Sequence, residues 1–366
     1  MIAVIKQSLE RLYHRYERYV PLVSFLGGFL WDSLTLTRID RLSDNLILLV
    51  YLVLSGVAIL LIHVIDQHRI THPQVLRFRE WYPVGLQFFL GGLFSSYVVF
   101  YFQSVSMTQT AVFFVLLVVL LVANEFLEDR LDNVYLQFTL FTLSAFSFFI
   151  FFIPIVVKRM TWWTVVLAIV FTAIIVGKFI YLLWRFGGLP SRQTVGRVAG
   201  ISGGVLALLI LFYVLNWIPP VPLSLKYGGV YHHVHRENNV YVLQYHAPPW
   251  YKFWVHYDKT FYYQPGDTVF CFTAVFAPTL LNTKIVHHWQ VYSEKEGRWL
   301  TTDQRRFQLF GGREKGYRGY TYKRNVRPGR WRVDVENQLG QVLGRISFRI
   351  VPADSQPRRM KTVYYE

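Results

Sequence analysis

The chain has 366 residues, a formal net charge of +16, and only 16% charged residues against 53% hydrophobic ones. Soluble domains average about a quarter charged residues, so the composition excludes a chain made only of ordinary soluble domains. The single cysteine, Cys271, excludes an intrachain disulfide and a cysteine-based metal cluster.

The charge is unevenly distributed along the chain. Residues 1–218 hold 16 Lys and Arg against 11 Asp and Glu, whereas residues 219–366 hold 22 against 11. Most of the basic excess therefore belongs to the second part. A basic surface favours anionic partners, which include lipid headgroups, acidic glycans, acidic proteins and nucleic acid.

The first part of the chain is predicted to be a transmembrane helical domain. Residues 1–19 form a charged, amphipathic segment, and no small-residue cleavage site follows the next apolar run, so no cleavable signal peptide is expected. Within residues 20–218, about seven apolar stretches are long enough, or nearly so, to cross a bilayer as helices. They cover residues 20–37, 45–65, 82–102, 107–123, 134–157, 162–184 and 198–218. The first and fourth are the shortest, and either could be re-entrant.

Basic residues in the flanks of these stretches predict the orientation. With the N-terminus inside, eleven Lys and Arg lie on inner segments and four lie in outer loops. Residues 1–19 are then cytoplasmic, and seven crossings place the C-terminal domain outside. In a bacterium with two membranes this predicts a multi-pass protein of the inner membrane with a periplasmic domain.

Two features of the membrane part bear on whether the helices themselves have a function. Phe25–Gly28 recurs as Phe89–Gly92, which indicates either a duplicated helical hairpin or the general frequency of glycine in membrane helices. The ionisable residues expected inside the bilayer are Asp32, His63 and Lys178, and they form no buried relay, which argues against a proton-coupled transporter.

An acidic run follows the fourth apolar stretch. If that helix continues, four carboxylates share one of its faces, which fits either a weak site for a hard divalent cation or a solvated helix end. These are Glu125, Glu128, Asp129 and Asp132. The solvated end is the preferred interpretation, so no metal and no cofactor is assigned.

After a proline-rich linker at residues 219–227, the hydrophobic period changes from helical to alternating. Residues 228–352 are predicted to form an all-β antiparallel sandwich of immunoglobulin-like shape, followed by a tail at residues 353–366. The clearest strands are expected at residues 268–277, 284–292, 316–323, 330–336 and 341–351, with Trp289 in the core. Cys271 faces the core or the solvent, depending on the register.

Five pieces of this region, in order, resemble a small bacterial domain family of unknown function, number 2914 in its series. The pieces are His288–Tyr292, Gly311–Arg313, Tyr317–Lys323, Pro328–Val335 and Gly340–Arg345. The domain is typically the C-terminal module of envelope proteins, and the membrane part resembles the uncharacterised multi-pass regions that accompany it. The resemblance implies a bacterial inner-membrane location and supplies no reaction, ligand or catalytic residue.

Aromatic residues are dense between Tyr241 and Tyr263, and Pro248-Pro249 interrupts the run. They are interpreted mainly as core strands or as contacts with the membrane. The alternative is a membrane-surface or sugar-stacking platform formed by Trp250, Tyr251, Phe253 and Trp254.

Basic residues gather on the later strands and their turns. Alternation places Arg330 and Arg332 on one outer face, and Arg345 and Arg349 are expected beside them on the next strand. The candidate ligand-binding set is Arg313, Arg318, Lys323, Arg330, Arg332, Arg345 and Arg349. Such a face fits an anionic envelope ligand, because arginine binds carboxylate and phosphate bidentately, or a solvated face neutralised by Asp334 and Glu336.

No catalytic motif is recognised, and no catalytic residue is assigned. The sequence has no nucleophile elbow with a Ser-His-Asp order, no P-loop and no His-Glu-x-x-His. His232, His233, His235, His287 and His288 suggest metal binding, but no Cys or carboxylate is seen to complete a set.

The predicted function is therefore that of a non-enzymatic envelope protein whose β domain binds an acidic glycan or a partner protein, as a scaffold, sensor or assembly factor. Nucleic acid is not expected as a partner of a periplasmic domain. The alternative is a transporter or a membrane-embedded enzyme that acts on lipid-linked substrates.

Overall fold

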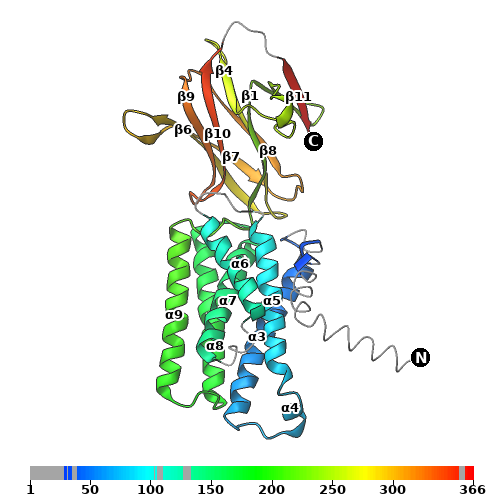
Figure 1. Cartoon of the computed structure of the whole chain (residues 1–366), viewed down its shortest axis with the longest axis vertical. Helices are drawn as coiled ribbons and strands as arrows, with labels where there is room; N and C mark the ends of the chain where they lie inside the picture. Colours follow the sequence, from blue (N-terminus) through cyan, green and yellow to red (C-terminus); the bar gives the residue numbers. More distant parts are fainter. Residues whose placement is uncertain are drawn as a thin grey trace, which may run out of the picture. The chain divides into compact units, whose positions relative to one another are not determined.

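The computed structural model describes residues 29–30, 32–34, 39–102, 104, 110–126, 133–353 and 359–366. The chain divides into two compact units. The first contains residues 1–100, 115–149 and 169–210, and the second contains residues 101–114, 150–168 and 211–366. Helices make up the first part of the chain and strands make up the C-terminal part (Figure 1).

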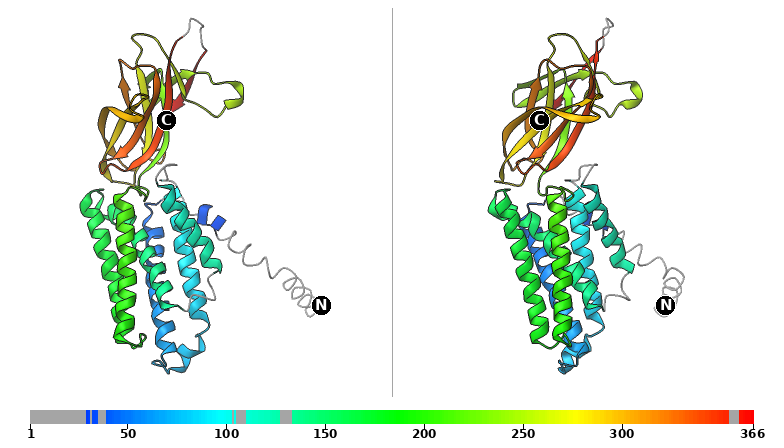
Figure 2. Two further views of the ribbon diagram at one scale, coloured as in Figure 1. Left: turned by 60° about the vertical axis from the view of Figure 1, so that its left-hand side comes forward. Right: turned by 90° about the vertical axis from the view of Figure 1, so that its left-hand side faces the viewer.

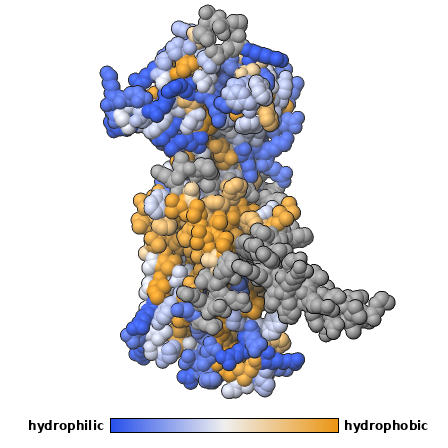
Figure 3. Space-filling model, viewed as in Figure 1, coloured by the Kyte–Doolittle hydropathy of each residue, from blue (hydrophilic) through white to orange (hydrophobic). Residues whose placement is uncertain are grey.

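Long apolar helices occupy most of the predicted membrane segments. The helices are α3 (Leu42–Asp66), α4 (Pro73–Arg77), α5 (Trp81–Phe102), α6 (Ala111–Phe126), α7 (Val134–Val157), α8 (Trp162–Arg185) and α9 (Arg192–Val214). Among the described residues, α3, α5, α7, α8 and α9 are long and apolar enough to cross a membrane. On the face shown in Figure 3, hydrophobic residues form a band across the helices, and hydrophilic residues gather at the lower end.

Two of the seven predicted segments differ from these five. Helix α6 has 16 residues, which is shorter than the ~20 that a spanning helix needs. The predicted segment at residues 20–37 lies almost entirely outside the described residues. The first copy of the repeated Phe-Leu-Gly-Gly sequence, Phe25–Gly28, is also outside the described residues, and the second copy belongs to α5.

Polar side chains pair between the helices of the first unit. The amide nitrogen of Asn124 in α6 donates to the carbonyl of Gln87 in α5, and the Gln87 amide donates to the Asn124 carbonyl, both at 3.1 Å. The His63 imidazole in α3 lies 2.7 Å from the amide oxygen of Gln137 in α7. Gly91 allows this approach of α5 and α6, since a Cβ there would lie 3.0 Å from the Asn124 amide. Paired polar groups of this kind hold membrane helices together.

Among the described residues, the C-terminal region is a β domain of eleven strands. They are β1 (Ser224–Tyr231), β2 (His233–Glu237), β3 (Val240–His246), β4 (Thr260–Tyr263), β5 (Val269–Phe276), β6 (Asn282–Ser293), β7 (Arg298–Phe310), β8 (Tyr317–Lys323), β9 (Gly329–Asn337), β10 (Val342–Pro352) and β11 (Met360–Tyr365). The five strands expected from the sequence correspond to β5, β6, β8, β9 and β10. The predicted linker already contains the start of β1, and the predicted tail contains β11.

These strands form three sheets with the orders β1-β5-β8, β4-β10-β9-β6-β7 and β11-β3-β2. All pairs are antiparallel except β4 with β10, which is parallel. A parallel pair requires a long connection between its strands, and the residues from β5 to β9 supply it here. The antiparallel expectation is therefore correct for the sheets except at this edge strand.

Two hydrophobic cores lie on opposite sides of β5. Val269, Cys271 and Val275 belong to the larger core, which also contains Trp289 and other side chains of the five-stranded sheet. Phe272 belongs to the smaller core with Tyr231, Leu243 and Tyr245, on the side of β2 and β3. Cys271 is fully buried, so the register places it in the core.

A polar cluster on β6 lies in the larger core. His287 is completely buried on β6, and its two ring nitrogens lie 2.8 Å from the hydroxyls of Thr273 and Thr321. The indole nitrogen of Trp289 donates to the same Thr321 hydroxyl at 3.1 Å. Burial lowers the pKa of His287 to about 3, so the imidazole is neutral and bonds the hydroxyls in that form.

We expect His287 to make the stability of the β domain depend on pH. Its folded pKa lies below the ordinary value of 6.5, so the unfolded chain binds a proton between these values and the folded chain does not. The contribution is complete above pH 6.5 and falls by about 1.4 kcal/mol per pH unit as the pH decreases below it. In His287→Gln that dependence disappears. Hydrogen exchange of the β6 amides in the full-length protein, corrected for intrinsic rates, measures it at pH 7 and 5. A wild-type advantage over the variant that does not shrink at pH 5 would contradict the prediction.

Candidate functional site

The outer face of the five-stranded sheet carries four of the predicted ligand-binding arginines. On β9, Trp331, Val333 and Val335 enter the core, so Arg330, Arg332, Asp334 and Glu336 point away from it. The β9–β10 register places Arg349 opposite Arg330 and Arg345 opposite Asp334. The predicted alignment of Arg345 and Arg349 beside the β9 arginines is therefore confirmed. Below, Arg330, Arg332, Arg345 and Arg349 are called the arginine face.

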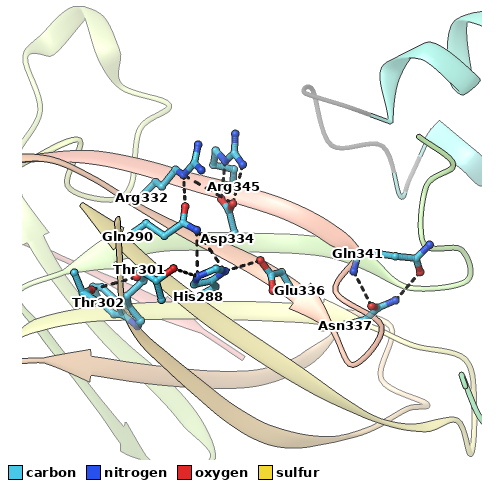
Figure 4. Close-up of polar contacts among 11 residues, drawn as sticks. His288, Gln290, Thr301, Thr302, Arg332, Asp334, Glu336, Asn337, Gln341 and Arg345 are labelled. Atoms are coloured by element: carbon cyan, nitrogen blue, oxygen red, sulfur yellow. Dashed lines mark hydrogen bonds and ion pairs between the residues drawn. The ribbon is translucent and has the colours of Figure 1, made fainter. Parts of the chain in front are cut away.

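Asp334 is the central anion of this face. Its carboxylate accepts two hydrogen bonds from Arg345, at 2.6 and 2.7 Å, and lies 3.9 Å from Nε of Arg332 (Figure 4). Only 3% of Asp334 is exposed. The hydrogen bonds to Asp334 raise the pKa of Arg345, whereas burial lowers the pKa of Arg332. One carboxylate thus lies beside two of the four arginines and balances one of their charges within the sheet.

A second set of contacts continues this network onto β6 and β7. Arg332 donates to the amide oxygen of Gln290, and the Gln290 nitrogen lies 3.1 Å from Nε2 of His288. The His288 ring also contacts Glu336 at 2.9 Å and the Thr301 hydroxyl at 2.8 Å (Figure 4). Burial raises the pKa of Glu336. These polar groups bind one another, so the network orients the arginines.

Aromatic rings support the two β9 arginines. The guanidinium of Arg330 lies 3.9 Å from the centre of the Tyr292 ring, and that of Arg332 lies 4.3 Å from the centre of Trp299. Glu294 pairs with Arg330 at 3.2 Å, but its side chain is 76% exposed. None of these three supporting residues was predicted from the sequence. The β6–β7 hairpin could have indicated two of them, because it brings Tyr292 opposite Trp299.

The other three basic candidates belong to a different part of the domain. Lys323 and Arg318 lie on β8 in the three-stranded sheet with β1 and β5, and Arg313 precedes that strand. Lys323 pairs with Asp303 at 3.5 Å, and Arg318 donates to the Asn239 carbonyl at 3.2 Å. Arg313 lies over the Tyr317 ring. The predicted set of seven is thus divided between two sheets.

The aromatic run from Tyr241 to Tyr263 is also divided. Tyr245 and Phe261 are buried on β3 and β4, as core strands require. In contrast, Trp250, Tyr251, Phe253 and Trp254 are 89%, 53%, 76% and 62% exposed. They lie on and just after the short 3-10 helix η3 (Trp250–Lys252), in a loop that projects from the strands (Figure 2). This loop presents amphipathic rings to its surroundings, as a stacking or membrane-surface segment would.

The acidic residues suggested for a cation lie outside the described part of the chain. Glu128, Asp129 and Asp132 are outside the described residues, and the side chain of Glu125 is also outside them. Of the histidines suggested for a metal, His287 is in the core, His288 is in the polar network of the outer face, and His232 lies between β1 and β2. The rings of His233 and His235 are neighbours on β2, 5.2 Å apart.

Comparison with known proteins identifies part of the β domain. Residues 282–350 match a family model described as "Protein of unknown function (DUF2914)", so a domain of this family is present at the C-terminus. No curated protein sequence matches the chain. Among solved structures, the alkylpurine DNA glycosylase AlkC of Pseudomonas fluorescens, bound to DNA with an abasic site analogue, aligns at 10% identity. The alignment covers 77% of this chain and 83% of that one. Its TM-score of 0.21 is too low to indicate a shared fold.

The Asp334 carboxylate should contribute much more to stability than the exposed Glu294. We expect Asp334→Ala to lower the unfolding free energy of the β domain by about 3 kcal/mol, because it leaves Arg345 and Arg332, both partly buried, without their nearest counter-charge. Glu294→Ala, which removes an exposed partner of Arg330, should change it by less than about 0.5 kcal/mol. Hydrogen exchange of the β9 and β10 amides in the full-length protein provides the comparison. Equal effects of the two substitutions would show that Asp334 is not the central anion.

Proposed function

We propose that this is a membrane-anchored, non-enzymatic protein of the bacterial envelope whose β domain binds an acidic glycan on the arginine face. The observation that carries the proposal is the pair formed by Arg330 and Arg349. These two exposed residues stand directly opposite each other on β9 and β10. Like charges in this position are destabilising, and an anion between them would offset the repulsion.

The surroundings of the pair favour a ligand over an internal counter-ion. Glu294 is exposed and so contributes little to holding Arg330. Asp334, the buried anion of the face, is already engaged by Arg345 through both oxygens. A uronate carboxylate or a phosphate can accept two parallel hydrogen bonds from each guanidinium, which is the geometry that arginine favours.

Preorganisation strengthens the same argument. Stacking on Tyr292 restricts the Arg330 side chain before any ligand arrives. Ordering a long side chain on binding costs about 0.5–1.5 kcal/mol, so an arginine that is already held loses less. The polar network of Gln290, His288 and Glu336 keeps the neighbouring Arg332 in place in the same way.

The binding proposal is tested with a polyuronate. Alginate serves as the acidic probe and dextran as the neutral one, with full-length protein in detergent. Arg330→Gln/Arg349→Gln should weaken alginate binding by at least about tenfold, since two charge-assisted contacts are lost. Higher salt should weaken the wild-type binding.

A matched control removes the same charge elsewhere. Arg236 on β2 and Arg305 on β7 are exposed, and by strand alternation Arg305 lies on the opposite side of its sheet from the arginine face. Arg236→Gln/Arg305→Gln should leave binding within about twofold of the wild type. Equal loss in both double variants would indicate non-specific attraction and contradict the proposal. Capture of an envelope protein, lost only in the first double variant, would replace the glycan with a protein partner.

The proposed location is the inner membrane, with the N-terminus in the cytoplasm and the β domain in the periplasm. The support is the excess of Lys and Arg in the predicted inner segments and the five long apolar helices among the described residues. The proposed shape of the β domain is an immunoglobulin-like sandwich, supported by the core between the five-stranded sheet and β1-β5-β8.

The orientation is tested by protease accessibility. The turn after β8 and the β6–β7 hairpin hold exposed basic residues, among them Arg324, Arg327 and Lys295, where trypsin can cut. We expect trypsin to release fragments of the β domain from spheroplasts and not from sealed inside-out vesicles. The reverse pattern would place the domain in the cytoplasm and would require an even number of crossings from a cytoplasmic N-terminus.

The alternative function, a transporter or a membrane-embedded enzyme acting on lipid-linked substrates, requires a polar cavity between the helices. The described polar groups of the first unit include two pairs that bond between helices, Gln87 with Asn124 and His63 with Gln137. Pairs of this kind support helix packing. Binding by the β domain is therefore the function that the described geometry favours.

A further inference from the structure

Two histidines and an aspartate converge at the base of the loop that carries η3. His232 lies between β1 and β2, His246 ends β3, and Asp258 precedes β4. Backbone hydrogen bonds fix the three positions, since the His232 amide donates to Gln244 and the Asp258 amide donates to Val230. One available ligand atom from each of the three side chains lies within 4.8 Å of the others. This group is called the His–Asp cluster.

The spacing of the cluster suits a cation better than direct pairing. Nε2 of His232 is 3.7 Å from one carboxylate oxygen of Asp258, and Nδ1 of His246 is 3.8 Å from the other. Both distances are too long for a hydrogen bond. Ligand atoms around a tetrahedral Zn²⁺ stand roughly 3.4 Å apart, given bonds of about 2.0–2.2 Å. The two distances between carboxylate and imidazole exceed that spacing by a few tenths of an ångström, and one ligand atom from each of the three residues lies within 4.8 Å of the others.

Burial of the Asp258 carboxylate favours a bound cation. The Asp258 side chain is only 2% exposed. Its Oδ1 accepts the backbone N–H of His246 at 3.0 Å, whereas Oδ2 has no hydrogen-bond partner, and neither does Nε2 of His232. A buried polar atom without a partner is costly, and a carboxylate is more costly still. Burial raises the pKa of Asp258 and lowers that of His232, which shows how poorly the site tolerates charge without a counter-charge.

Aromatic neighbours orient the imidazoles. The His232 ring is stacked on Phe261, with ring centres 3.9 Å apart, and the His246 ring meets Tyr262 edge-on. The two imidazoles are themselves only 4.2 Å apart between centres. Two imidazoles and one carboxylate, held close together by packing, are the donor set of many zinc sites that keep a further position open.

We propose that His232, His246 and Asp258 bind a divalent transition-metal ion of the Zn²⁺ class. Because His246 and Asp258 are the two ends of the loop at residues 247–257, the ion links these ends. The exposed aromatic residues Trp250, Tyr251, Phe253 and Trp254 lie on this loop. Bound metal therefore orders the loop, and this site is independent of the arginine face.

Metal stoichiometry is the first test. Full-length protein, with affinity tags removed and metal stripped by a chelator, is dialysed against Zn²⁺ and analysed for bound metal. One equivalent per chain is expected for the wild type. Asp258→Asn keeps the shape of the side chain and His246→Gln keeps most of its size, and each should reduce bound metal to less than about a tenth of an equivalent at the same free Zn²⁺.

The control uses the neighbouring surface histidines. His233→Ala/His235→Ala removes two imidazoles from β2 without touching the cluster, and it should keep the full equivalent. Metal that is lost in this control and retained in Asp258→Asn would overturn the proposal. Absence of a bound equivalent in the wild type would also overturn it. Co²⁺ provides an optical check, since its visible absorption reports imidazole and carboxylate ligation.

Hydrogen exchange of residues 247–257 gives a readout that does not depend on stoichiometry. Zn²⁺ should slow exchange in this loop at least about tenfold in the wild type, since opening the loop then requires release of the ion. The same addition should have no effect in Asp258→Asn or His246→Gln. Retained exchange protection of β3 and β4 in these variants shows that they are folded. Equal slowing in wild type and variants would contradict the site.

Discussion

The β domain depends on a single strand that is buried on both sides. Strand alternation sends Val269, Cys271 and Val275 of β5 into the larger core, while Phe272 enters the smaller one. A strand of this kind cannot slip by one residue, because a slip would exchange the sets of side chains in both cores. The packing of β5 therefore fixes how its own sheet is placed against the five-stranded sheet on one side and against β2 and β3 on the other. The arginine face and the His–Asp cluster both rest on this arrangement.

The two candidate sites differ in how their buried carboxylate is neutralised. On the arginine face, Asp334 is nearly inaccessible but binds Arg345 through two short hydrogen bonds, so its charge is matched within the protein. What remains exposed is positive, because Arg330 and Arg349 have no comparable anion. In the His–Asp cluster the buried Asp258 carboxylate accepts the backbone N–H of His246 and lies 3.7 and 3.8 Å from the imidazoles of His232 and His246, and its Oδ2 has no hydrogen-bond partner. The first site therefore suits an anionic ligand, and the second suits a cation.

Much of the β domain was predictable where the alternation was strong. β6, β9 and β10 each place aliphatic or aromatic side chains on one face and charged ones on the other, so their strands, their core residues and the position of the arginines followed from the period of two. The sequence did not predict β1, β2, β7 and β11 because they are short or mixed in polarity. Part of the His–Asp cluster had a sequence signal: Asn238-Asn239, both with positive φ, form the turn of the β2–β3 hairpin, which brings His232 near His246.

The sequence by itself determined the apolar helices, the change to a β domain after the prolines, the basic excess of that domain and the sidedness of its strongest strands. These properties depend on composition and local periodicity, which the chain carries residue by residue. Only the tertiary structure decided which charges meet. It separated Arg318 and Lys323 from Arg330 and Arg349, exposed the rings around η3, and placed Asp258 beside two histidines. Such contacts depend on strand order and register between distant segments, and no local pattern encodes them.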